Sequence, residues 1–338
     1  MPTIKDIASL TGFSITTVSR ALNGYDDVNE QTKEKIEATA LEIGYVPNML
    51  AQNLVMKKSK MIGILINELK RESVKDNFVF EMLCGVSDAL NDSDYEFVLI
   101  STSTAKQKNK TFKQLCEERQ LAGVIIQGLK SDDQYLDEIT FSNVPCVLID
   151  IPITNKTTRY VTSNQTKSIK DAIKYLYHLG HKEIAYMNGS EDAFVSSIRK
   201  QGFLDALKEI GIPANQHYII NGQYDEEIAK KVTIPFLINN PEVTAIFCAS
   251  DVMAIGVLSA AFELEIKVPE QLSIIGFDNI LLSRYMRPPL TTIAQSPYEM
   301  ATVGIQLLTT MIEDEQEKTP FILVNSELII RESTTVRG

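Results

Sequence analysis

The sequence has few of the residues from which disulfides, metal clusters and membrane spans are made. It holds four cysteines and three histidines in 338 residues, and the cysteines are far apart and form no CxxC pair. We therefore expect buried, reduced thiols in a cytosolic protein, without disulfides or a metal site. No apolar run approaches the roughly 20 residues needed to span a bilayer. The first residues, MPTIKDIASL, lack a basic start followed by an apolar stretch, so we expect no secretory signal and a cytoplasmic location.

The motifs of several large enzyme classes are also absent. The sequence has no GxSxG nucleophile elbow, Walker A loop, GxGxxG fingerprint or HExxH zinc motif. His178 and His181 are separated by Leu179 and Gly180. Because the glycine is expected to end the helix between them, the two histidines are a poor metal-binding pair. The helix dipole favours histidine at a helix C-terminus instead. We expect no enzymatic activity, no cofactor and no metal.

Charge is distributed unevenly along the chain. The net charge of −11 argues against a nucleic-acid binder if the chain is taken as a whole. Residues 1–60, however, hold seven Lys or Arg and seven Asp or Glu, so their net charge is zero and residues 61–338 carry the whole −11. This asymmetry permits DNA binding by the N-terminal segment. With 44% hydrophobic residues, the chain is also long enough for more than one domain.

Three short helices are predicted within residues 1–46. A polar residue suited to the N-cap position precedes each helix, and a glycine follows the first and the third helix. The predicted caps are Thr3 (in a capping box with Asp6), Ser14 and Asn29, and the glycines are Gly12 and Gly44. The helices are residues 4 to about 10, 15 to about 22, and 30–43. Two short helices joined by a tight glycine turn, with a third packed on them, form the helix-turn-helix arrangement.

The second helix is the candidate DNA-reading element. Small hydroxyl side chains suit phosphate oxygens, and Arg20 has the fork that matches guanine O6 and N7. Ile15 offers only apolar contact, for example to a thymine methyl group. From the residues alone, a three-helix bundle with a solvated polar face remains open as the alternative. The candidate DNA contacts here are Thr3, Ser14, Ile15, Thr16, Thr17, Ser19, Arg20 and Asn23.

Four segments between Ile4 and Leu54 resemble the headpiece of the LacI/GalR family of bacterial transcriptional regulators. They keep the spacing of that family, which favours the DNA-binding interpretation over the plain bundle. The segments are Ile4-Lys5-Asp6-Ile7-Ala8, Thr17-Val18-Ser19-Arg20-Ala21-Leu22-Asn23, Gly44-Tyr45-Val46-Pro47-Asn48 and Leu50-Ala51-Gln52-Asn53-Leu54.

Residues 47–58 are expected to form a hinge helix and linker. Pro47 suits a helix start, and a helix this short is marginal alone in water, so it should order only against its two-fold mate and DNA. The resemblance implies that paired hinge helices lie in the minor groove, that Leu54 wedges a base step open, and that Ala51 allows the helices to approach. Asn48 is the third candidate contact. Lys57, Lys58 and Lys60 could contact phosphates, or they could form a plain charged linker. A core position remains the alternative for Leu54.

From residue 59 onward, apolar strands alternate with amphipathic helices, which predicts parallel sheets covered on both faces. The strand-like runs are residues 61–66, 97–101, 123–127, 146–150, 183–187, 244–248 and 272–276, and 326–330 near the C-terminus. The helical stretches include 80–91, 106–119, 166–179, 196–210 and 251–264. Residues 59–338 are too many for a single sheet, so we expect two α/β lobes. A ligand should bind at the carboxyl ends of the strands.

This region resembles the periplasmic-binding-protein-like core of the same family. The matching pieces are Leu179-Gly180-His181, Arg199 with Gly202-Phe203, Ala249-Ser250-Asp251, Gly276-Phe277-Asp278 and Pro288-Pro289-Leu290-Thr291-Thr292. The resemblance implies an all-α helix-turn-helix headpiece (1–46), a hinge (47–58), and a two-lobed, type I, doubly wound α/β core (59–338) that also dimerises. It further implies three crossings between the lobes, near residues 160, 290 and 320.

Polar residues that follow strands suggest an effector cleft. An arginine with two or three acceptors around a cleft suits a polyhydroxylated ligand or a carboxylate, and a tyrosine can stack on the apolar face of a sugar ring. A structural role remains the alternative for Asp251 and Asp278. By resemblance, the effector-contacting positions are Phe78, Asp150, Arg199, Tyr224, Ser250, Asp278 and Gln295.

Four positions depart from the family pattern and leave the identity of the effector open. Ser250 stands where the family often has Asn, Ser163-Asn164 replaces an Asp-Asn pair, Phe78-Val79 replaces an aromatic pair, and Asp150-Ile151 replaces an Asp-Arg pair. These changes remove hydrogen-bonding groups and one ring.

The resemblance implies a repressor that binds a palindromic operator as a homodimer. The chain ends soon after residues 326–330 without a leucine-heptad tail, so we expect a dimer and not a tetramer. A small molecule, a sugar in our first interpretation, would shift DNA affinity by rotating the lobes. Alternatives are control by a phosphocarrier protein, a nucleobase corepressor, and a solute-binding protein for transport; the headpiece argues against the last.

Overall fold

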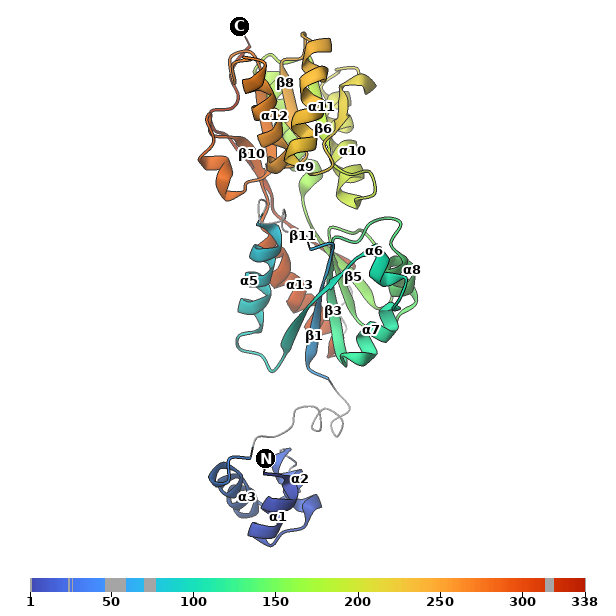
Figure 1. Ribbon diagram of the computed structural model, residues 1–338, viewed down its shortest axis with the longest axis vertical. Coiled ribbons are helices and arrows are strands. Elements are labelled where there is room, and N and C mark those ends of the chain that lie inside the picture. Colours follow the sequence, from blue (N-terminus) through green and yellow to red (C-terminus); the bar gives the residue numbers. More distant parts are fainter. Residues whose placement is uncertain are drawn as a thin grey trace. The chain divides into compact units, whose positions relative to one another are not determined.

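A computed structural model describes residues 2–23, 25, 27–45, 59–69, 77–313 and 319–337. The chain divides into two compact units, Met1–Lys60 and Met61–Gly338 (Figure 1). The predicted hinge contacts Asn48, Ala51 and Leu54 lie outside the described residues.

The small unit contains three helices in its described part, α1 (Ile4–Thr11), α2 (Ile15–Leu22) and α3 (Glu30–Glu42). Their ends follow from local side-chain chemistry. The Ser14 hydroxyl accepts a hydrogen bond from the Thr17 amide (3.0 Å), and the Asn29 side chain accepts one from the Thr32 amide (2.9 Å). Gly12 ends α1 at φ +77°. The helix-turn-helix prediction is confirmed, with α1 one residue longer and α3 one residue shorter than expected.

Five apolar residues, each at most 6% exposed, form the core of this unit. They come from all three helices: Ile7, Val18, Ala21, Ile36 and Ala40. Since the buried positions of α2 are Val18 and Ala21, the opposite face of that helix is left to polar side chains.

The described residues of the large unit form two six-stranded sheets, one in each lobe. In the N-terminal lobe the strand order is β11-β5-β4-β3-β1-β2, and every neighbouring pair is parallel. These strands are β1 (Met61–Asn67), β2 (Glu96–Thr102), β3 (Leu121–Gln127), β4 (Cys146–Ile149), β5 (Thr158–Ser163) and β11 (Phe321–Val324).

The C-terminal lobe has the order β12-β10-β9-β8-β6-β7. Its strands are parallel except for β12, which runs antiparallel to β10. The strands are β6 (Ile184–Asn188), β7 (Ile219–Asn221), β8 (Ala245–Cys248), β9 (Ser273–Asp278), β10 (Thr291–Ala294) and β12 (Glu327–Ile329).

Helices cover both faces of each sheet, as expected for a doubly wound fold (Figure 1). In the N-terminal lobe, α5 (Phe78–Leu90) and α13 (Pro297–Ile312) cover one face. The short helices α6 (Thr104–Gln107), α7 (Phe112–Glu118) and α8 (Gln134–Phe141) cover the other. In the C-terminal lobe, α9 (Gln165–His178) and α10 (Phe194–Glu209) lie opposite α11 (Glu226–Asn239) and α12 (Asp251–Glu263).

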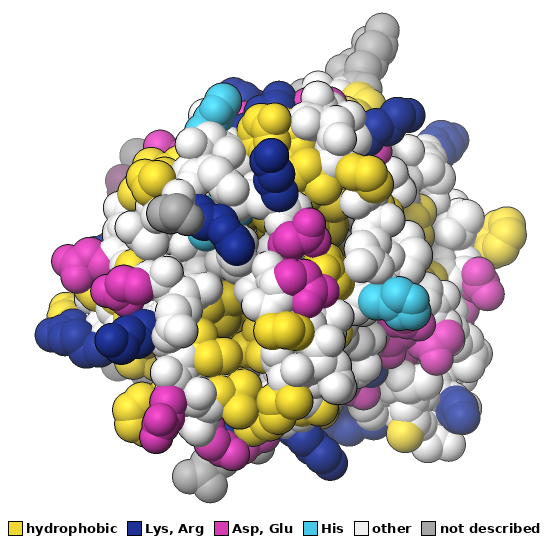
Figure 2. Space-filling model, turned by 90° about the horizontal axis from the view of Figure 1, so that it is seen from above, with side chains coloured by type: hydrophobic (Ala, Val, Ile, Leu, Met, Phe, Trp, Pro, Cys, Tyr) yellow, Lys and Arg dark blue, Asp and Glu magenta, His cyan; other side chains and the backbone are white. Residues whose placement is uncertain are grey.

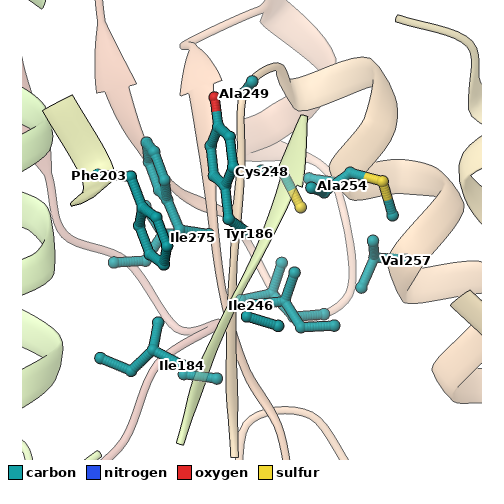
Figure 3. Packing of buried hydrophobic residues seen from close by; sticks show 14 of the residues in the cluster. Ile184, Tyr186, Phe203, Ile246, Cys248, Ala249, Ala254, Val257 and Ile275 are labelled. Carbon is teal, nitrogen blue, oxygen red and sulfur yellow. The ribbon is translucent and has the colours of Figure 1, made fainter. Parts of the chain in front are cut away.

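An aromatic stack anchors the core of the C-terminal lobe (Figure 3). Tyr186 on β6 lies between Phe203 of α10 and Phe247 of β8, with ring centroids 4.9 and 5.8 Å apart. All three rings are buried. The stack fixes α10 against its sheet, and α10 is the helix that carries Arg199.

The chain passes between the lobes at three places: after β5, after β10 and after β11. These are the crossings that the resemblance implied near residues 160, 290 and 320. They bring residues 163–164, 295 and 325 to the junction, and Ser163 donates a hydrogen bond to Gln295 there (3.1 Å).

One predicted helix is wrong in its extent. Residues 106–119 form two helices, α6 and α7, because Thr111 begins a new helix with a capping box to Gln114. Helices α8, α11 and α13 and the short strands β5, β7, β10 and β11 were not among the predicted elements.

Within the described residues, no helix has both the length and the apolar character required to cross a membrane. One face of the large unit carries hydrophobic side chains interspersed with acidic and basic ones (Figure 2).

Candidate functional site

The exposed face of α2 carries the predicted DNA-reading residues. Ile15 is 50% exposed, and Ser14, Thr16 and Arg20 are also exposed. A shallow hollow on this face is lined by Ile15, Thr16, Ser19, Arg20 and Tyr25. An α-helix presenting such side chains has the dimensions that the major groove admits.

Some of the predicted contacts already have partners within the headpiece. The Ser14 and Thr17 hydroxyls share a hydrogen bond (2.8 Å). The Asn23 side-chain amide donates to the Ser19 carbonyl (2.7 Å). Thr3 lies at the start of α1, where its hydroxyl donates to the Asp6 carboxylate (2.8 Å). Arg20 is exposed on the same face and pairs with the Asp27 carboxylate. Ile15 and Thr16 are therefore the most open of the predicted contacts on α2.

A cleft between the two lobes gathers the predicted effector residues. It encloses about 250 Å³. All seven predicted positions line it: Phe78, Asp150, Arg199, Tyr224, Ser250, Asp278 and Gln295. They reach it from the carboxyl ends of strands or from the starts of helices, as parallel sheets require.

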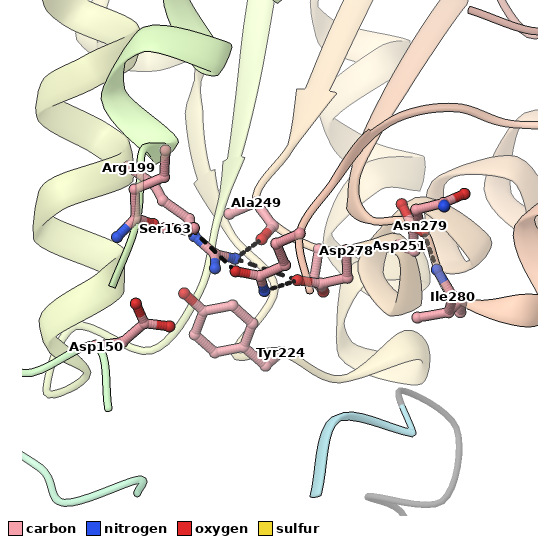
Figure 4. Close-up of polar contacts among 12 residues, drawn as sticks. Asp150, Ser163, Arg199, Tyr224, Ala249, Asp251, Asp278, Asn279 and Ile280 are labelled. Atoms are coloured by element: carbon pink, nitrogen blue, oxygen red, sulfur yellow. Dashed lines mark hydrogen bonds and ion pairs between the residues drawn. The ribbon is translucent and has the colours of Figure 1, made fainter. Parts of the chain in front are cut away.

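Arg199 is the centre of the polar network in the cleft (Figure 4). Its side chain is buried at 3% exposure, and its guanidinium lies 3.7 Å from the centroid of the Phe277 ring. Nε donates to the Gln165 side chain (2.8 Å), and Nη1 donates to the Ala249 carbonyl (2.6 Å). Nη1 also lies 3.8 Å from Asp278. These contacts fix the plane of the guanidinium before any ligand arrives.

Two carboxylates flank this arginine. Asp150 follows β4 at φ +59°, and its carboxylate accepts a hydrogen bond from Thr162 (2.5 Å). Asp278 ends β9 and accepts a hydrogen bond from Gln295 (2.6 Å). Since Gln295 in turn accepts a hydrogen bond from Ser163, one amide connects Asp278 to the crossover strand. Both side chains line the cleft with carboxylate oxygens, which are hydrogen-bond acceptors.

Burial and charge act in opposite directions on the ionisable groups of the cleft. Burial raises the pKa of Asp150, while the Arg199 guanidinium opposes that rise. Burial disfavours the charged form of Arg199, but the surrounding Tyr224, Asp278 and Asp150 outweigh it and raise its pKa. Burial also raises the pKa of Tyr224, so this phenol is neutral at physiological pH.

Tyr224 and Ser250 complete the C-terminal side of the cleft. The Tyr224 hydroxyl accepts a hydrogen bond from Ser196 (3.1 Å). A Cβ atom at Gly189 would lie 2.0 Å from the Tyr224 ring, so glycine is required for this ring position. Ser250 caps α12 by accepting from the Met253 amide (3.2 Å) and also lines the cleft.

Asp251 has the structural role that was open from the sequence. It is fully buried and accepts hydrogen bonds from the Ile280 amide (2.9 Å) and the Thr292 hydroxyl (2.5 Å). It therefore ties the loop after β9 to α12, whereas Asp278 lines the cleft. His178 is the last residue of α9, as expected, but His181 lies beyond the helix and is buried.

Several residues of the cleft were missed from the sequence. Asn67 and Gln127 end β1 and β3 and line the cleft, and their position at strand ends was the signal that would have found them. Glu68 and Phe194 also line it. At its edge, Lys130 of the N-terminal lobe pairs with Glu68 (3.4 Å) and with Asp192 of the C-terminal lobe (3.1 Å).

Comparison with known proteins gives matches for both units. Residues 3–48 match the family described as "Bacterial regulatory proteins, lacI family", and residues 173–334 match "Periplasmic binding protein-like domain". The chain is 33% identical over 334 residues to the "Probable HTH-type transcriptional repressor ExuR" of Bacillus subtilis (strain 168), covering 98% of each. It is 33% identical over 339 residues to the HTH-type transcriptional repressor CytR of Escherichia coli (strain K12), covering 98% of this chain and 96% of that one.

Solved structures agree with the fold. A "transcriptional regulator CelR-cellobiose complex" matches with a TM-score of 0.76 at 25% identity, over 98% of this chain and 100% of that one. A lac repressor dimer bound to operator and the anti-inducer ONPF matches with a TM-score of 0.83 at 24% identity, over 99% of both chains. The chain belongs to the lacI family of bacterial regulatory proteins, as a DNA-binding transcription regulator with a helix-turn-helix headpiece and a periplasmic-binding-protein-like core.

Proposed function

We propose that this protein is a sequence-specific repressor that binds a palindromic operator as a homodimer and is controlled by a sugar or sugar derivative in the cleft. The observation that carries the proposal is the set of polar groups in the cleft, where Asp150 and Asp278 flank Arg199 beside the ring of Tyr224. It acts in the bacterial cytoplasm, and we assign it no catalytic step.

The chemistry of the cleft favours a ligand rich in hydroxyl groups. Two carboxylates accept hydrogen bonds from hydroxyls, and a guanidinium with its plane already fixed donates to oxygens. An aromatic ring at the same place suits the apolar face of a sugar ring. A phosphorylated or carboxylated ligand would add a further acidic group to a cleft in which Asp150 and Asp278 already share the single arginine Arg199, so we expect such ligands to bind less well.

The ligand would act by changing the relation between the two lobes. It shifts DNA affinity only through its different affinities for two lobe arrangements, typically about 1–3 kcal/mol of coupling. Since residues 47–58 connect the lobes to the headpiece, we infer that they transmit this change, with Leu54, Ala51 and Asn48 at the minor groove.

A homodimer fits both the operator symmetry and the surface of the large unit. An isologous dimer presents two headpieces to two half-sites. Large apolar side chains are exposed on both lobes, including Phe80 on α5 (62%) and Phe262 on α12 (87%). Light scattering at micromolar concentration checks this, and a monomer at all concentrations would contradict it.

The experiment that tests the ligand class is a thermal-shift screen with neutral sugars, sugar phosphates, hexuronates and nucleobases. A ligand that binds the folded state raises the unfolding temperature by mass action. We expect neutral sugars or glycosides to do so. If only nucleobases shift the transition, the protein is a corepressor-type regulator. If no small molecule acts but a phosphorylated phosphocarrier protein changes DNA binding, a protein partner controls it.

A further inference from the structure

Arg20 has a fixed partner on the face of α2. Its Nε donates to the Asp27 carboxylate (3.0 Å), and its Nη2 forms an ion pair with the other oxygen of the same carboxylate. Asp27 lies in the segment between α2 and α3, seven residues after Arg20. The contact is bidentate and approaches the guanidinium from the side that carries Nε.

The ring of Tyr25 contacts the same guanidinium in a cation–π interaction. Its centroid lies 4.9 Å from the Arg20 guanidinium carbon. The Tyr25 amide donates to the Arg20 carbonyl (3.1 Å), which fixes the start of the segment that brings Asp27 back to the helix. Three contacts therefore orient one side chain on the face expected to read DNA.

The remaining donors of Arg20 are those that a guanine needs. A guanidinium has five N–H groups, one on Nε and two on each Nη. The Asp27 carboxylate uses Nε–H and one N–H of Nη2. Among the described residues, the outer N–H of Nη2 and the two N–H groups of Nη1 have no hydrogen-bond partner, and one from each Nη points parallel at the tip of the side chain. This end-on pair matches O6 and N7 of guanine.

A carboxylate on a DNA-facing surface otherwise weakens binding, because DNA is a dense array of negative phosphates. An isolated surface ion pair also contributes little to stability. At this position, however, the pair neutralises Asp27 and removes side-chain freedom that Arg20 would lose on binding. The contact is thus worth more to DNA recognition than to folding.

We propose that Asp27 is a positioning residue that holds Arg20 for end-on, bidentate recognition of a guanine in each half-site. The inference rests on the proposed function, since it needs a preferred DNA sequence.

The test is a double-mutant cycle on the full chain. Selection of a randomised duplex library with the wild type gives a preferred duplex, and a shuffled duplex of the same composition serves as the non-specific probe. Asp27→Asn, Arg20→Lys and the double variant are compared by fluorescence anisotropy. Glu37→Gln removes a carboxylate charge from an exposed position on α3 and is the matched control.

Asp27→Asn should bind the preferred duplex about tenfold more weakly than the wild type, the loss typical of one impaired bidentate base contact. Its affinity for the shuffled duplex should be unchanged or slightly higher, as with Glu37→Gln. In the Arg20→Lys background, Asp27→Asn should cause no further loss. Replacing the contacted guanine by 7-deazaguanine should weaken binding of the wild type. The same replacement should weaken binding of Asp27→Asn much less.

Two results would overturn the inference. If Asp27→Asn binds the preferred duplex as tightly as the Glu37→Gln control, or more tightly, Asp27 is neutral or competes with DNA for Arg20. If Asp27→Asn weakens binding as much in the Arg20→Lys background as in the wild type, Asp27 does not act through Arg20. A wild type that selects no sequence would instead overturn the proposed function. Thermal unfolding of Asp27→Asn, together with its binding to the shuffled duplex, shows that the headpiece is folded.

Discussion

Arg199 is bound on three sides before a ligand reaches the cleft. Gln165, the Ala249 carbonyl and the Phe277 ring hold it, and the carboxyl groups of Asp150 and Asp278 lie on either side of it in the cleft. A ligand therefore meets acceptors whose orientation is already fixed, which lowers the entropy lost on binding.

Replacing Asp150 tests this arrangement directly. Asp150→Asn keeps the size of the side chain but removes the charge that faces Arg199 and one acceptor. We expect the affinity for the active sugar to fall tenfold or more, since a hydrogen bond to a charged group contributes about 1.5–3 kcal/mol. Isothermal titration calorimetry measures it. Asp132→Asn, at an exposed position outside the cleft, is the control, and equal sugar affinities for the two variants would contradict the assignment.

His181 predicts a pH dependence of stability. Its Nε2 faces the Thr335 carbonyl (3.1 Å), which only accepts, so Nε2 carries the proton and Nδ1 accepts from the Thr244 hydroxyl (3.0 Å). Burial lowers the pKa of His181 against the weaker effect of the Thr335 contact. The unfolded chain therefore binds the proton more readily, and this contribution is complete above about pH 6.5 and declines as the pH falls below it.

Urea unfolding between pH 5 and 8 measures the effect. The difference in unfolding free energy between wild type and His181→Gln should shrink as the pH falls. His217→Gln, at an exposed position, is the matched control for the loss of a histidine. A constant difference across this range would show that His181 does not titrate differently in the two states.

At the scale of elements, the contact between α5 and α13 depends on a missing side chain. A Cβ atom at Gly85 would lie 2.2 Å from the Tyr298 carbonyl oxygen, which belongs to the backbone and cannot turn away. The two helices can approach this closely only because residue 85 is glycine.

Gly85→Ala should therefore destabilise the large unit by about 1–3 kcal/mol, the usual cost of overpacking. Gly304→Ala on α13 is the matched control, since its Cβ would meet only side chains at 3.5 Å or more. This second change should be neutral or stabilising, because alanine favours a helix interior by about 1 kcal/mol over glycine. Denaturant unfolding of both variants decides, and equal effects would refute the close-contact explanation.

Elements with local signals were predictable from the sequence. Helix α2 was expected at residues 15–22 because Ser14 caps it and its apolar positions keep a helical period. Central strands such as β3 and β8 were recognisable as apolar runs. Helix α11 was not, since it contains Pro235, and β5 and β10 are short, threonine-rich crossover strands whose pairing depends on partners distant in sequence.

The candidate site was predictable to the same degree. The cleft residues follow strands, and the resemblance pointed to them, so the structure finds them together. The contact between Arg20 and Asp27 was not predictable, because Asp27 follows α2 outside any regular element and no sequence pattern places it beside Arg20. The pairing of Lys130 with Asp192 joins two lobes and likewise has no local signal.

At the scale of the whole molecule, Lys130 and Asp192 connect the lobes at the edge of the cleft. Their ion pair is 3.1 Å long, and the Ser131 amide donates to the Asp192 carbonyl (2.8 Å). Phe194 lies two residues after Asp192 in the C-terminal lobe and packs on an apolar cluster of the N-terminal lobe. These contacts stabilise the lobe arrangement that the structure shows.

Asp192→Asn should shift the balance between lobe arrangements by up to about 1 kcal/mol, the range of half-exposed ion pairs. We expect a change of up to about fivefold in sugar affinity and a weaker dependence of that affinity on salt. Lys113→Met, which removes an exposed pair within α7, is the control. An unchanged salt dependence in Asp192→Asn would mean that this pair does not report on the lobe arrangement.

The central claim is that one small molecule in the cleft changes how tightly the headpieces hold a specific DNA sequence. The most direct test is the Kd of the library-selected duplex, measured by anisotropy with and without the sugar that gives the largest thermal shift. At saturating sugar, we expect this Kd to change about fivefold or more in the wild type. At a sugar concentration near the wild-type Kd for the sugar, the change in Asp150→Asn should be much smaller than in the wild type. A sugar that binds the wild type without altering this Kd, or one that alters it equally in Asp150→Asn, would contradict the account.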